Sequence, residues 1–509
     1  MHLSEQEIVR REHLEAIREM GIDPYPAAQY HLTDTAESIR NNFDDAELEN
    51  YKLETVCLAG RMMTMRDMGK AAFISLQDSS GRIQLYVSSN DICPEGDTEK
   101  AYYKSFVKKL LDIGDYIGVT GYKFRTKVGE ISIHVKSLTL LSKCLRPLPI
   151  VKIDADGNKY DEFIDPELRY RMRYVDLTVN PHVKPIFMAR IKLMTTMRNF
   201  FNNEGWLEVE TPILQTIHGG AAARPFKTHH NTLDMPLYLR IANELYLKRL
   251  IVGGFDGVYE FGKMFRNEGM DRTHNPEFTA VELYVAYKDY FWMMDMTEKL
   301  LQTCAEAVTG STEVTIGERT INFASPFQRY TMYESIEKFT GIDVAEMDEN
   351  ALRDLCKKMH IDTDNSMGKG KLIDEIFGAK VEHNLVQPTF ITDYPEEMSP
   401  LTKKHRSKPG LVERFELFIN CKEVANAYSE LNDPIDQRAR FEEQLKLVER
   451  GDDEAMPLDE DFLRALEFGM PPTSGIGIGI DRLTMMLTNQ VSIQEVLFFP
   501  QMRAEIAGA

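Results

Sequence analysis

The sequence predicts an α+β protein in which a small β-barrel precedes a larger domain built on a mostly antiparallel sheet flanked by helices. Short runs of alternating apolar and polar residues follow an N-terminal helical pattern. Further on, strands and helices alternate irregularly, without the βαβ rhythm of a doubly wound sheet. The 509 residues exceed one ordinary core. The expected divisions are a helical region at 1–50, a barrel at 51–145, a linker or docking segment at 146–180, and a larger domain at 181–509 with a charged helical insertion near 331–385.

The composition predicts a globular, cytoplasmic protein. Hydrophobic residues make up 43% and charged residues 28% of the chain. No apolar run approaches about 18 residues, and the start "MHLSEQEIVRREHLEAIREM" is a charged helical pattern, unlike a signal or transit peptide. We therefore expect no membrane partner. The net charge of −20 argues against wholesale coating of nucleic acid, so a polyanionic partner would have to meet a locally basic surface.

Neither a disulfide framework nor a zinc site is indicated. The six cysteines are widely scattered, with no CxxC pair. A metal site could be suspected at His218, His229 and His230. No cysteine or carboxylate stands at ligand spacing from them, so no zinc is expected.

The first domain is expected to be an OB-fold, a small five-stranded Greek-key barrel. Three strands are predicted in "TVCLAGRMMTM", "AAFISLQD" and "RIQLYVSS". A helical stretch near "EKAYYKSFVKKLLDIG" follows, and then two strands in "DYIGVTGYKF" and "EISIHVKSLTLL". Five short strands with a helix between the third and the fourth are typical of this fold.

Alternation along these strands predicts an outward face with aromatic rings. The inward residues of the second, third and fifth strands are Ile74, Leu76, Ile83, Leu85, Val87, Ile131, Ile133 and Val135. The residues between them then face outward, including Phe73, Gln84, Tyr86, Glu130, Ser132 and His134. Rings beside hydrogen-bonding side chains such as Arg66 and Gln84 suit stacking on a single-stranded base. The alternative is that helices of the same chain cover this face.

The larger domain is expected to open with a helix and a strand. Apolar residues recur at helical spacing at Ile186, Leu193, Met197 and Phe200. Two asparagines and a glycine within 202–205 form the helix stop, and "WLEVETP" then reads as a strand that ends at Pro212.

Two stretches concentrate charge in a way that suits a charged ligand. "FRNEGMDRTHNPEFT" packs two arginines, two glutamates, an aspartate and a histidine between phenylalanines around a turn. "ERFELFINCKEVANAYSELNDP" has Glu416 and Glu423 seven residues apart. Farther along it, alternation predicts one shared strand face for Asn426, Tyr428 and Glu430.

A third stretch, "SGIGIGIDRLTMML", alternates glycines before a helix that opens with Asp481 and Arg482. The run is neither GxGxxG nor a phosphate-binding GxxxxGK[ST] loop. Alternating glycines leave one strand face bare, against which another backbone packs or a flat ligand lies. Both interpretations stay open.

Together these stretches resemble the class II aminoacyl-tRNA synthetases. "FRNE" with "HNPEFT" is similar to their second signature motif, "GIGIGIDRL" to the third, and the helix and strand ending at Pro212 to the first. Across nearly the whole chain, the strings "GRMMTMRDMGKAAFISLQD", "RYRMRYVDL", "GGAAARPFKTHHN", "ELYLKRLIVGGFDGVYEFGKMFRNEG" and "SELNDP" resemble the lysyl-tRNA synthetases of the compact bacterial type. This resemblance implies a catalytic domain at 181–509 that activates L-lysine with ATP and transfers it to the 3′ end of tRNA(Lys).

The resemblance implies that Arg266 and Arg482 are the catalytic arginines. Arg266 would neutralise the α-phosphate of ATP and orient both reactants. Phe278 and Arg482 would enclose the adenine from its two sides, and Arg482 would reach the γ-phosphate. The other implied nucleotide contacts are Glu268, His274 and Asn275.

The implied cofactor is Mg²⁺. Glu416 and Glu423 would bind it across the triphosphate. Paired carboxylates together with phosphate oxygens are typical magnesium ligands.

The resemblance also implies which residues select lysine. Glu430 would pair with the ε-ammonium, since a buried cation needs a counter-charge. Tyr284 would add a hydroxyl contact, with Glu282 on the same face. The alternative interpretation makes Glu430 a structural ion-pair partner.

At the other end of the substrate, Glu244 and the carbonyl of Gly220 would bind the α-ammonium. Asn426 and Arg266 would bind the carboxylate. Tyr428 would line the pocket where phenylalanine is common in the family, which leaves tolerance of lysine analogues open. Asn243 stands where proline is expected.

The resemblance implies that the barrel binds a uridine-rich anticodon through Arg66, Phe73, Gln84 and Glu130. It further implies attack by the 3′-hydroxyl and a homodimer built on the helix and strand that end at Pro212. Three alternatives stay open: a lysine-activating enzyme with a protein acceptor, a tRNA-binding protein without catalysis, and aspartyl or asparaginyl specificity. The last would need a cation in place of Glu430.

Overall fold

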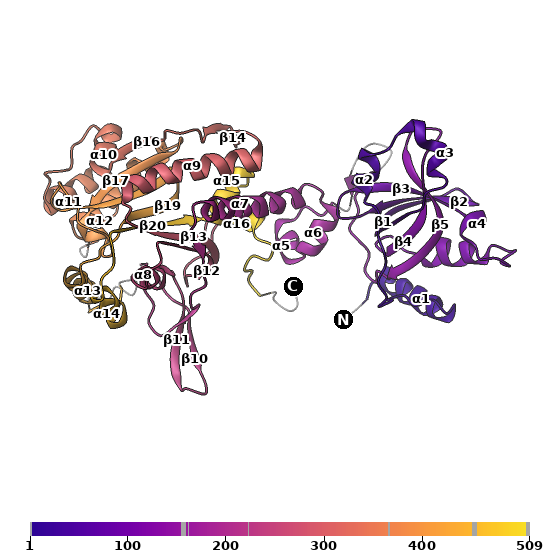
Figure 1. The fold of residues 1–509 in the computed structure, drawn as a ribbon, viewed down its shortest axis with the longest axis horizontal. Coiled ribbons are helices and arrows are strands. Elements are labelled where there is room, and N and C mark those ends of the chain that lie inside the picture. Colours follow the sequence, from indigo (N-terminus) through magenta and orange to yellow (C-terminus); the bar gives the residue numbers. More distant parts are fainter. Residues whose placement is uncertain are drawn as a thin grey trace. The chain divides into compact units, whose positions relative to one another are not determined.

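The structure is a computed structural model that divides into two compact units, Met1–Phe163 and Ile164–Ala509 (Figure 1). The residues described are 3–153, 159–160, 162–221, 223–364, 367–449 and 456–504. Residues 154–158 and 161 of the expected linker, and 365–366 of the expected insertion, lie outside them. None of the helices within the described ranges is long and apolar enough to cross a lipid bilayer.

The first unit is built around a closed barrel with the strand order β1-β2-β3-β5-β4. Its strands are β1 (Val56–Asp67), β2 (Ala71–Gln77), β3 (Arg82–Ser88), β4 (Tyr116–Arg125) and β5 (Ile131–Ser142). Strands β3 and β5 are parallel, and the other neighbours are antiparallel. Residues predicted to point inward, such as Ile74, Leu85 and Val135, are fully buried in the barrel core. The predicted OB-fold is confirmed.

Short helices surround this barrel. They are α1 (Glu5–Glu19), α2 (Ala36–Asn41), η1 (Asp45–Glu47), α3 (Leu48–Tyr51), α4 (Ser89–Ile92) and η2 (Tyr102–Leu110), a π-helix at the position predicted between β3 and β4. Two-residue strands β6 (Lys152–Ile153) and β7 (Lys159–Tyr160) pair near the end of the unit. A capping box between Ser4 and Glu7 starts α1, which buries Leu14 and Ile17.

The second unit contains an eight-stranded sheet with the order β16-β17-β18-β19-β20-β13-β12-β8. Its strands are β8 (Leu207–Glu208), β12 (Gly257–Phe265), β13 (Glu277–Ala286), β16 (Gln328–Thr331), β17 (Thr389–Pro395), β18 (Leu411–Ile419), β19 (Lys422–Ser429) and β20 (Thr473–Gly479). The sheet is antiparallel except at its two edges, where β8 and β16 are parallel to their neighbours. The predicted α+β class with a mostly antiparallel sheet is confirmed.

This unit also contains further strands and the helices that flank its sheet. The remaining strands are β9 (Leu214–Gln215), β10 (Lys227–His230), β11 (Met235–Leu239), β14 (Glu313–Ile316) and β15 (Arg319–Asn322). The helices are α5 (Pro166–Arg171), α6 (Arg173–Val179), α7 (Val183–Asn203), α8 (Glu244–Val252), α9 (Tyr290–Thr309), α10 (Met332–Thr340), α11 (Glu349–Lys358), α12 (Lys369–Lys380), η3 (Glu382–Asn384), η4 (Glu396–Met398), α13 (Pro434–Glu449), α14 (Glu460–Glu467), α15 (Ile480–Leu487) and α16 (Ile493–Val496).

The two faces of the large sheet differ in chemistry. On one face, Val281 and Leu283 of β13 and Ile476 and Ile478 of β20 pack with α7, α9 and α15 in the main core. Helices α7 and α9 lie side by side over this face (Figure 1). Because side chains alternate along a strand, the residues between these apolar ones point to the opposite face. That face contains the candidate site.

One predicted element is much shorter than expected. The strand expected in "WLEVETP" is limited to the two residues of β8. Val209 N–H still donates to the Tyr259 carbonyl at 2.9 Å, but the chain then leaves β12, and the Ile213 carbonyl accepts from the Arg240 N–H at 2.9 Å where β9 pairs with β11. The prediction of a strand running to Pro212 was therefore wrong.

Candidate active site

A row of paired residues crosses the middle of the sheet. Glu282 of β13 pairs with Gly477 of β20, Gly477 pairs with Asn426 of β19, and Asn426 pairs with Glu416 of β18. The adjacent row consists of Tyr284, Gly475, Tyr428 and Arg414. Opposed residues in an antiparallel sheet point to the same side. Candidate residues from distant parts of the sequence therefore share one surface.

The alternating glycines of β20 make room for side chains of this surface. A Cβ at Gly475 would lie 2.3 Å from Glu430 Oε1 and 2.3 Å from Tyr284 Cε1. A Cβ at Gly477 would lie 2.8 Å from Glu282 Oε1. The bare strand face expected from the glycine run is thus occupied by acidic and aromatic side chains, which a bulkier strand would displace.

A buried ammonium group lies among the residues expected to bind lysine. Lys248 Nζ of α8 is 2.5 Å from Glu244 Oε1 and also forms an ion pair with Glu430 through Oε2. Tyr428 Oη donates to Glu244 Oε1 at 2.5 Å. Gly220, at φ +87°, approaches Glu244 so closely that a Cβ would lie 3.2 Å from the glutamate Cβ. The ion pair anticipated by the alternative interpretation of Glu430 is present, but Glu430 Oε1 has no hydrogen-bond partner among the described residues.

The environment of these acidic groups makes their ionisation unfavourable. Burial raises the pKa of Glu282 to about 8, and the Glu244 carboxylate raises it further. Burial also raises the pKa of Glu430 well above its usual range, although Lys248 acts in the opposite direction. Tyr284 Oη donates to Glu282 Oε2 at 3.1 Å. Buried carboxylates with raised pKa values are typical of functional sites, and a bound cation would favour their ionised forms.

If the site binds lysine, as the sequence predicts, its affinity for lysine should rise with pH. A bound cation favours the ionised form of Glu282, so below its pKa of about 8 the affinity should fall about tenfold per pH unit, and it should level off above. Glu244 opposes ionisation of Glu282, while Tyr284, Arg266 and Lys248 favour it. Calorimetric titration with lysine across pH measures this dependence. An affinity that does not change from about pH 6 to about pH 8 would contradict the role of Glu282.

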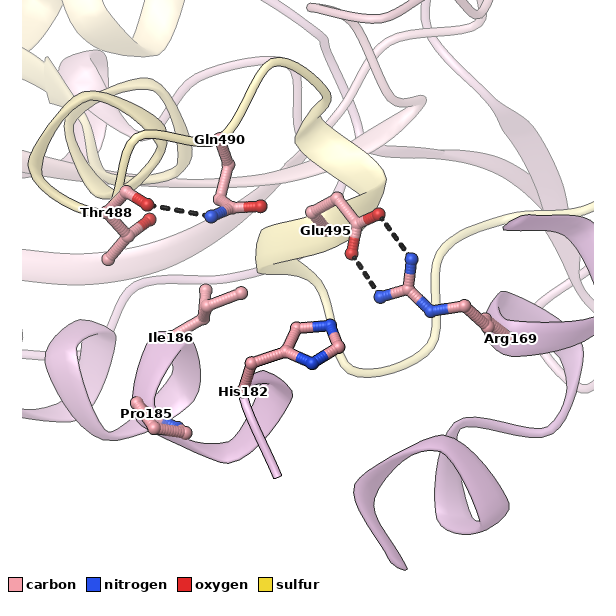
Figure 2. A pocket seen from close by; sticks show the side chains of 7 residues that line it. All are labelled: Arg169, His182, Pro185, Ile186, Thr488, Gln490 and Glu495. Carbon is pink, nitrogen blue, oxygen red and sulfur yellow. Dashed lines mark hydrogen bonds and ion pairs between the residues drawn. The ribbon is translucent and has the colours of Figure 1, made fainter. Parts of the chain in front are cut away.

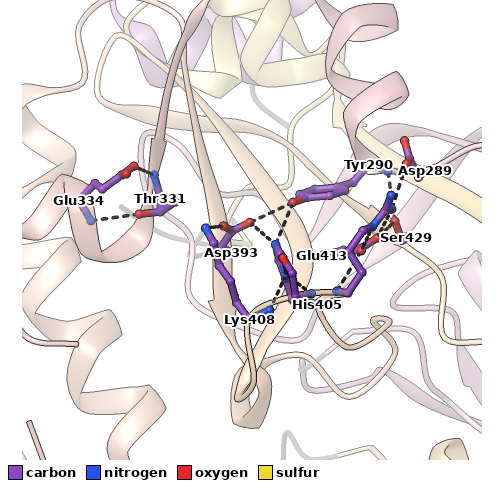
Figure 3. A network of polar contacts seen from close by, with 11 residues as sticks. Asp289, Tyr290, Thr331, Glu334, Asp393, His405, Lys408, Glu413 and Ser429 are labelled. Carbon is purple, nitrogen blue, oxygen red and sulfur yellow. Dashed lines mark hydrogen bonds and ion pairs between the residues drawn. The ribbon is translucent and has the colours of Figure 1, made fainter. Parts of the chain in front are cut away.

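A polar network fixes the end of the strand from which Glu430 projects (Figure 3). Ser429 Oγ accepts a hydrogen bond from the Tyr290 N–H at 3.1 Å and donates to Glu413 Oε2 at 2.7 Å. Arg406 binds both oxygens of Glu413, at 2.5 and 2.8 Å. A charge-assisted network of this kind restrains the backbone next to Glu430.

Arg266 and Phe278 form the expected nucleotide end. Arg266 follows β12 directly, and its N–H donates to the Pro276 carbonyl at 2.8 Å, which closes the turn. Its guanidinium carbon lies 5.1 Å from the Phe278 ring centroid, and within the described part of the chain its Nε has no hydrogen-bond partner. Burial lowers the pKa of Arg266. In the same turn, Glu268 is exposed and Asn275 is buried.

Arg482 of α15 joins this turn to β19. Arg482 Nη1 donates to the Glu423 carbonyl at 2.8 Å and lies 3.3 Å from Glu423 Oε2. Its Nη2 lies 3.2 Å from His274 Nε2, and His274 Nδ1 lies 2.8 Å from Asp271 Oδ2. The structure thus brings together the arginine and the histidine that were expected near the terminal phosphate.

The chemistry of Glu416 and Glu423 suits Mg²⁺. Burial raises the pKa of Glu416, and the Glu423 carboxylate raises it too, while Arg414 lowers it. Mg²⁺ binds proteins through one or two carboxylates and completes its shell with phosphate oxygens and water, so this pair fits. In the ranges that the structure describes, no three His, Cys, Asp or Glu side chains are grouped for metal binding.

Two residues of the site were absent from the sequence prediction. Lys248 stands four residues after Glu244, a spacing at which helical side chains meet, so the signal was present. Arg414 stands two residues before Glu416 and donates to Glu416 Oε1 at 2.5 Å and to Asn426 Oδ1 at 3.0 Å. Its shared strand face with Glu416 was a weaker signal.

A separate pocket of about 420 Å³ lies beside the start of α7 (Figure 2). Its lining residues are Arg169, His182, Pro185, Ile186, Thr488, Gln490 and Glu495. Arg169 binds both oxygens of Glu495, at 3.0 and 2.9 Å. The candidate active-site residues do not line this pocket.

The outward face of the barrel in the first unit contains the predicted rings. Phe73 and Tyr86 are half-buried, with centroids 5.3 Å apart, and the Arg66 guanidinium carbon lies 5.6 Å from the Phe73 centroid. Phe124, which was not predicted, packs edge-on to Tyr86 at 6.1 Å, and His134 does so at 5.1 Å. The rings form a partly exposed aromatic surface.

Next to these rings, Glu130 is exposed and Gln84 donates to Ser132 Oγ at 2.9 Å. Ser132 was expected to face outward, and it stands opposite the outward residue Gln84 and accepts its hydrogen bond, although it is fully buried.

Replacing Phe73 by alanine should weaken tRNA binding by about 1–3 kcal/mol, because it removes one stacking surface. ATP–pyrophosphate exchange without tRNA should not change, because its chemistry lies in the other unit. Filter binding measures the first quantity. Tyr116→Ala, which removes an exposed ring outside this cluster, is the control. Equal losses in the two variants would contradict a specific role for Phe73.

Comparison with known proteins identifies the families of both units. Residues 165–503 match the family described as tRNA synthetases class II (D, K and N). Residues 56–141 match the OB-fold nucleic acid binding domain. The first match covers more than half of the chain. The chain therefore belongs to the class II tRNA synthetases.

Relatives that align with almost the whole chain are lysine–tRNA ligases. The chain is 63% identical over 505 residues to the lysine–tRNA ligase of Porphyromonas gingivalis, which covers 99% of this chain and 86% of that protein. It is 63% identical over 503 residues to that of Christiangramia forsetii, covering 99% and 87%. It is 61% identical over 503 residues to that of Azobacteroides pseudotrichonymphae, covering 99% of each.

Proposed function

We propose that this chain is a lysine–tRNA ligase that acts in two steps. In the first, a carboxylate oxygen of L-lysine attacks the α-phosphorus of ATP, and the bond to the β-phosphate oxygen breaks to give lysyl-adenylate and pyrophosphate. In the second, the 3′-hydroxyl at the end of tRNA(Lys) attacks the lysyl carbonyl and releases AMP. The observation that carries the choice of lysine is the buried cluster of Glu244, Glu282, Glu430 and Lys248.

The charge of this cluster matches lysine. Three carboxylates against one ammonium leave two negative charges when all are ionised. L-lysine brings two ammonium groups, one at each end, and so neutralises the cluster. Glu430, whose Oε1 is unpaired among the described residues, receives the ε-ammonium, and Glu244 with Gly220 receives the α-ammonium. An aspartate or asparagine side chain brings no second cation, which leaves buried negative charge uncompensated.

Arg266 brings together the two anions that react, the α-phosphate of ATP and the carboxylate of lysine. Arg266, with its unfilled donors, contacts the α-phosphate and the lysine carboxylate, and Asn426 assists at the carboxylate. This contact offsets their repulsion and orients the attack without covalent chemistry. The planar guanidinium suits such paired oxygen contacts.

The adenine lies on Phe278, and Arg482 covers its other side. Arg482 and His274 then face the terminal phosphate, with Glu268 and Asn275 shaping the turn around the nucleotide. Mg²⁺, bound by Glu416 and Glu423, supplies charge neutralisation along the triphosphate.

The barrel of the first unit reads the anticodon of tRNA(Lys). Phe73 stacks on a base, and Arg66, Gln84 and Glu130 supply the hydrogen bonds that distinguish it. The half-buried rings support this assignment, since base stacking needs an accessible ring face.

The enzyme works as a homodimer built on α7 and the segment that follows it. Large apolar side chains remain exposed there, at Met188, Ile191, Leu207, Ile213 and Leu214. Such a stripe on a monomer surface favours contact with a second copy. Sedimentation at micromolar concentration should give a dimer mass, and a monomer mass there would contradict this part of the proposal.

Aminoacylation with purified components tests the function. The enzyme with ATP, Mg²⁺, L-lysine and tRNA(Lys) should form lysyl-tRNA, AMP and pyrophosphate. Adenylate formation without transfer to tRNA would point to an enzyme with another acceptor. Binding of tRNA without either step would identify a binding protein and would contradict the proposal.

A further inference from the structure

The side chain of Lys248 is a fully buried cation that lies between carboxylates and aromatic rings. Its Nζ lies 5.4 Å from the Tyr428 ring centroid and 5.9 Å from that of Phe462. Burial by itself lowers the pKa of Lys248, but Glu244 and Glu430 outweigh burial and raise it, so the side chain is an ammonium. A buried charge is tolerated only when it is paired, and here both partners belong to the proposed substrate pocket.

We propose that Lys248 is the positioning residue that sets the lysine specificity of this site, by joining Glu244 and Glu430 and by neutralising one of three buried carboxylates. This inference rests on the proposed function and extends it to a residue that does not itself touch the substrate.

The geometry indicates how Lys248 acts. Its ion pairs engage Glu244 Oε1 and Glu430 Oε2, so the same ammonium orients two carboxylates that bind opposite ends of lysine. Glu430 Oε1 is left without a hydrogen-bond partner in the described ranges and lies against the bare backbone of Gly475. Glu430 thus keeps Oε1 for the substrate while Lys248 engages its Oε2.

Lys248 also determines the charge that the substrate has to supply. With Lys248 present, two further positive charges are enough to neutralise the three ionised carboxylates. L-lysine brings this number, one ammonium group at each end. Lys248 lowers the pKa of both Glu282 and Glu430, so without Lys248 the ionised form of these carboxylates would be still less favourable. The other groups that face these carboxylates are Tyr284 from β13, Tyr428 from β19 and Arg266 after β12.

The test compares Lys248→Met with Lys143→Met. Lys143 is the matched control, since it is also fully buried and bridges two carboxylates, Asp112 at 2.5 Å and Asp115 at 2.8 Å, but it lies in the barrel unit. ATP–pyrophosphate exchange gives KM for lysine, KM for ATP, kcat and their pH profiles, and thermal unfolding reports stability. K248M should raise KM for lysine at least about tenfold, leave KM for ATP within about twofold, and shift the acid limb of kcat/KM for lysine to higher pH.

K143M should lose stability without changing KM for lysine or the pH profile. An unchanged or lower KM for lysine in K248M, with an unchanged acid limb, would overturn the proposal. So would a K143M variant that changes both parameters equally. If K248M does not fold, Lys248→Arg retains the positive charge and should keep the wild-type acid limb, and an alkaline shift in K248R would count against the charge argument. Absence of lysine-dependent exchange in the unmodified enzyme would instead reject the proposed function.

Discussion

Replacing Arg266 by alanine should lower kcat/KM for lysine-dependent ATP–pyrophosphate exchange by about 1,000-fold or more. A single preorganised donor to a developing anion contributes about 100- to 1,000-fold in kcat, and Arg266 is expected to serve both the phosphate and the carboxylate. Its guanidinium is prepared for this role, because it lies over Phe278 and its Nε is unpaired among the described residues. Exchange kinetics with purified protein measure the effect.

Two variants separate charge from geometry at this position. Arg266→Lys retains the charge but not the planar fork, and it should recover only a small part of the activity. Arg272→Ala removes an exposed arginine of the same turn and should leave kcat/KM nearly unchanged. If R266A and R272A lose activity to a similar degree, the general charge of the turn matters rather than Arg266.

The second large effect is expected for Glu430→Gln, which should raise KM for lysine by about 100-fold. Removing one partner of a buried charge pair costs about 3–5 kcal/mol, and about 3 kcal/mol corresponds to this factor. Glutamine has nearly the same shape, so the loss reports charge and not packing. KM for ATP should stay within about twofold, since the proposed partner of Glu430 is the ε-ammonium of lysine and not the nucleotide.

The control for Glu430 is Glu298→Gln, a buried glutamate of α9 whose ion-pair partner, Arg329, stands on the edge strand β16 of the sheet. Its substitution should affect stability but not KM for lysine. A Glu430→Gln variant with the wild-type KM for lysine would mean that the ion pair with Lys248 is the whole role of Glu430.

Local periodicity predicted the parts of the structure that local geometry determines. The pleat alone decides which side of a strand a side chain takes, so Phe73 and Tyr86 were correctly predicted on one outward face. Alternation also predicted that Asn426 and Tyr428 share a face. The bare strand face in the glycine run was predicted for the same reason, although not the side chains that occupy it.

Tertiary contacts account for what the sequence did not predict. The ion pair between Lys248 and Glu430 depends on the packing of α8 against the end of β19, which no local pattern encodes. The order β19-β20-β13 likewise brings Glu282 beside Asn426 across Gly477. The short β8 follows from tertiary contacts as well, because the chain after Val209 leaves β12 and its next strand, β9, pairs with β11.

ATP–pyrophosphate exchange without tRNA, measured separately with each of the twenty amino acids, tests the central claim most directly. The claim is that the cluster of Glu244, Glu282, Glu430 and Lys248 selects an amino acid with two ammonium groups. Exchange should occur with lysine and remain at background with the others, aspartate and asparagine included. Exchange with aspartate or asparagine instead of lysine would contradict the assignment of this pocket.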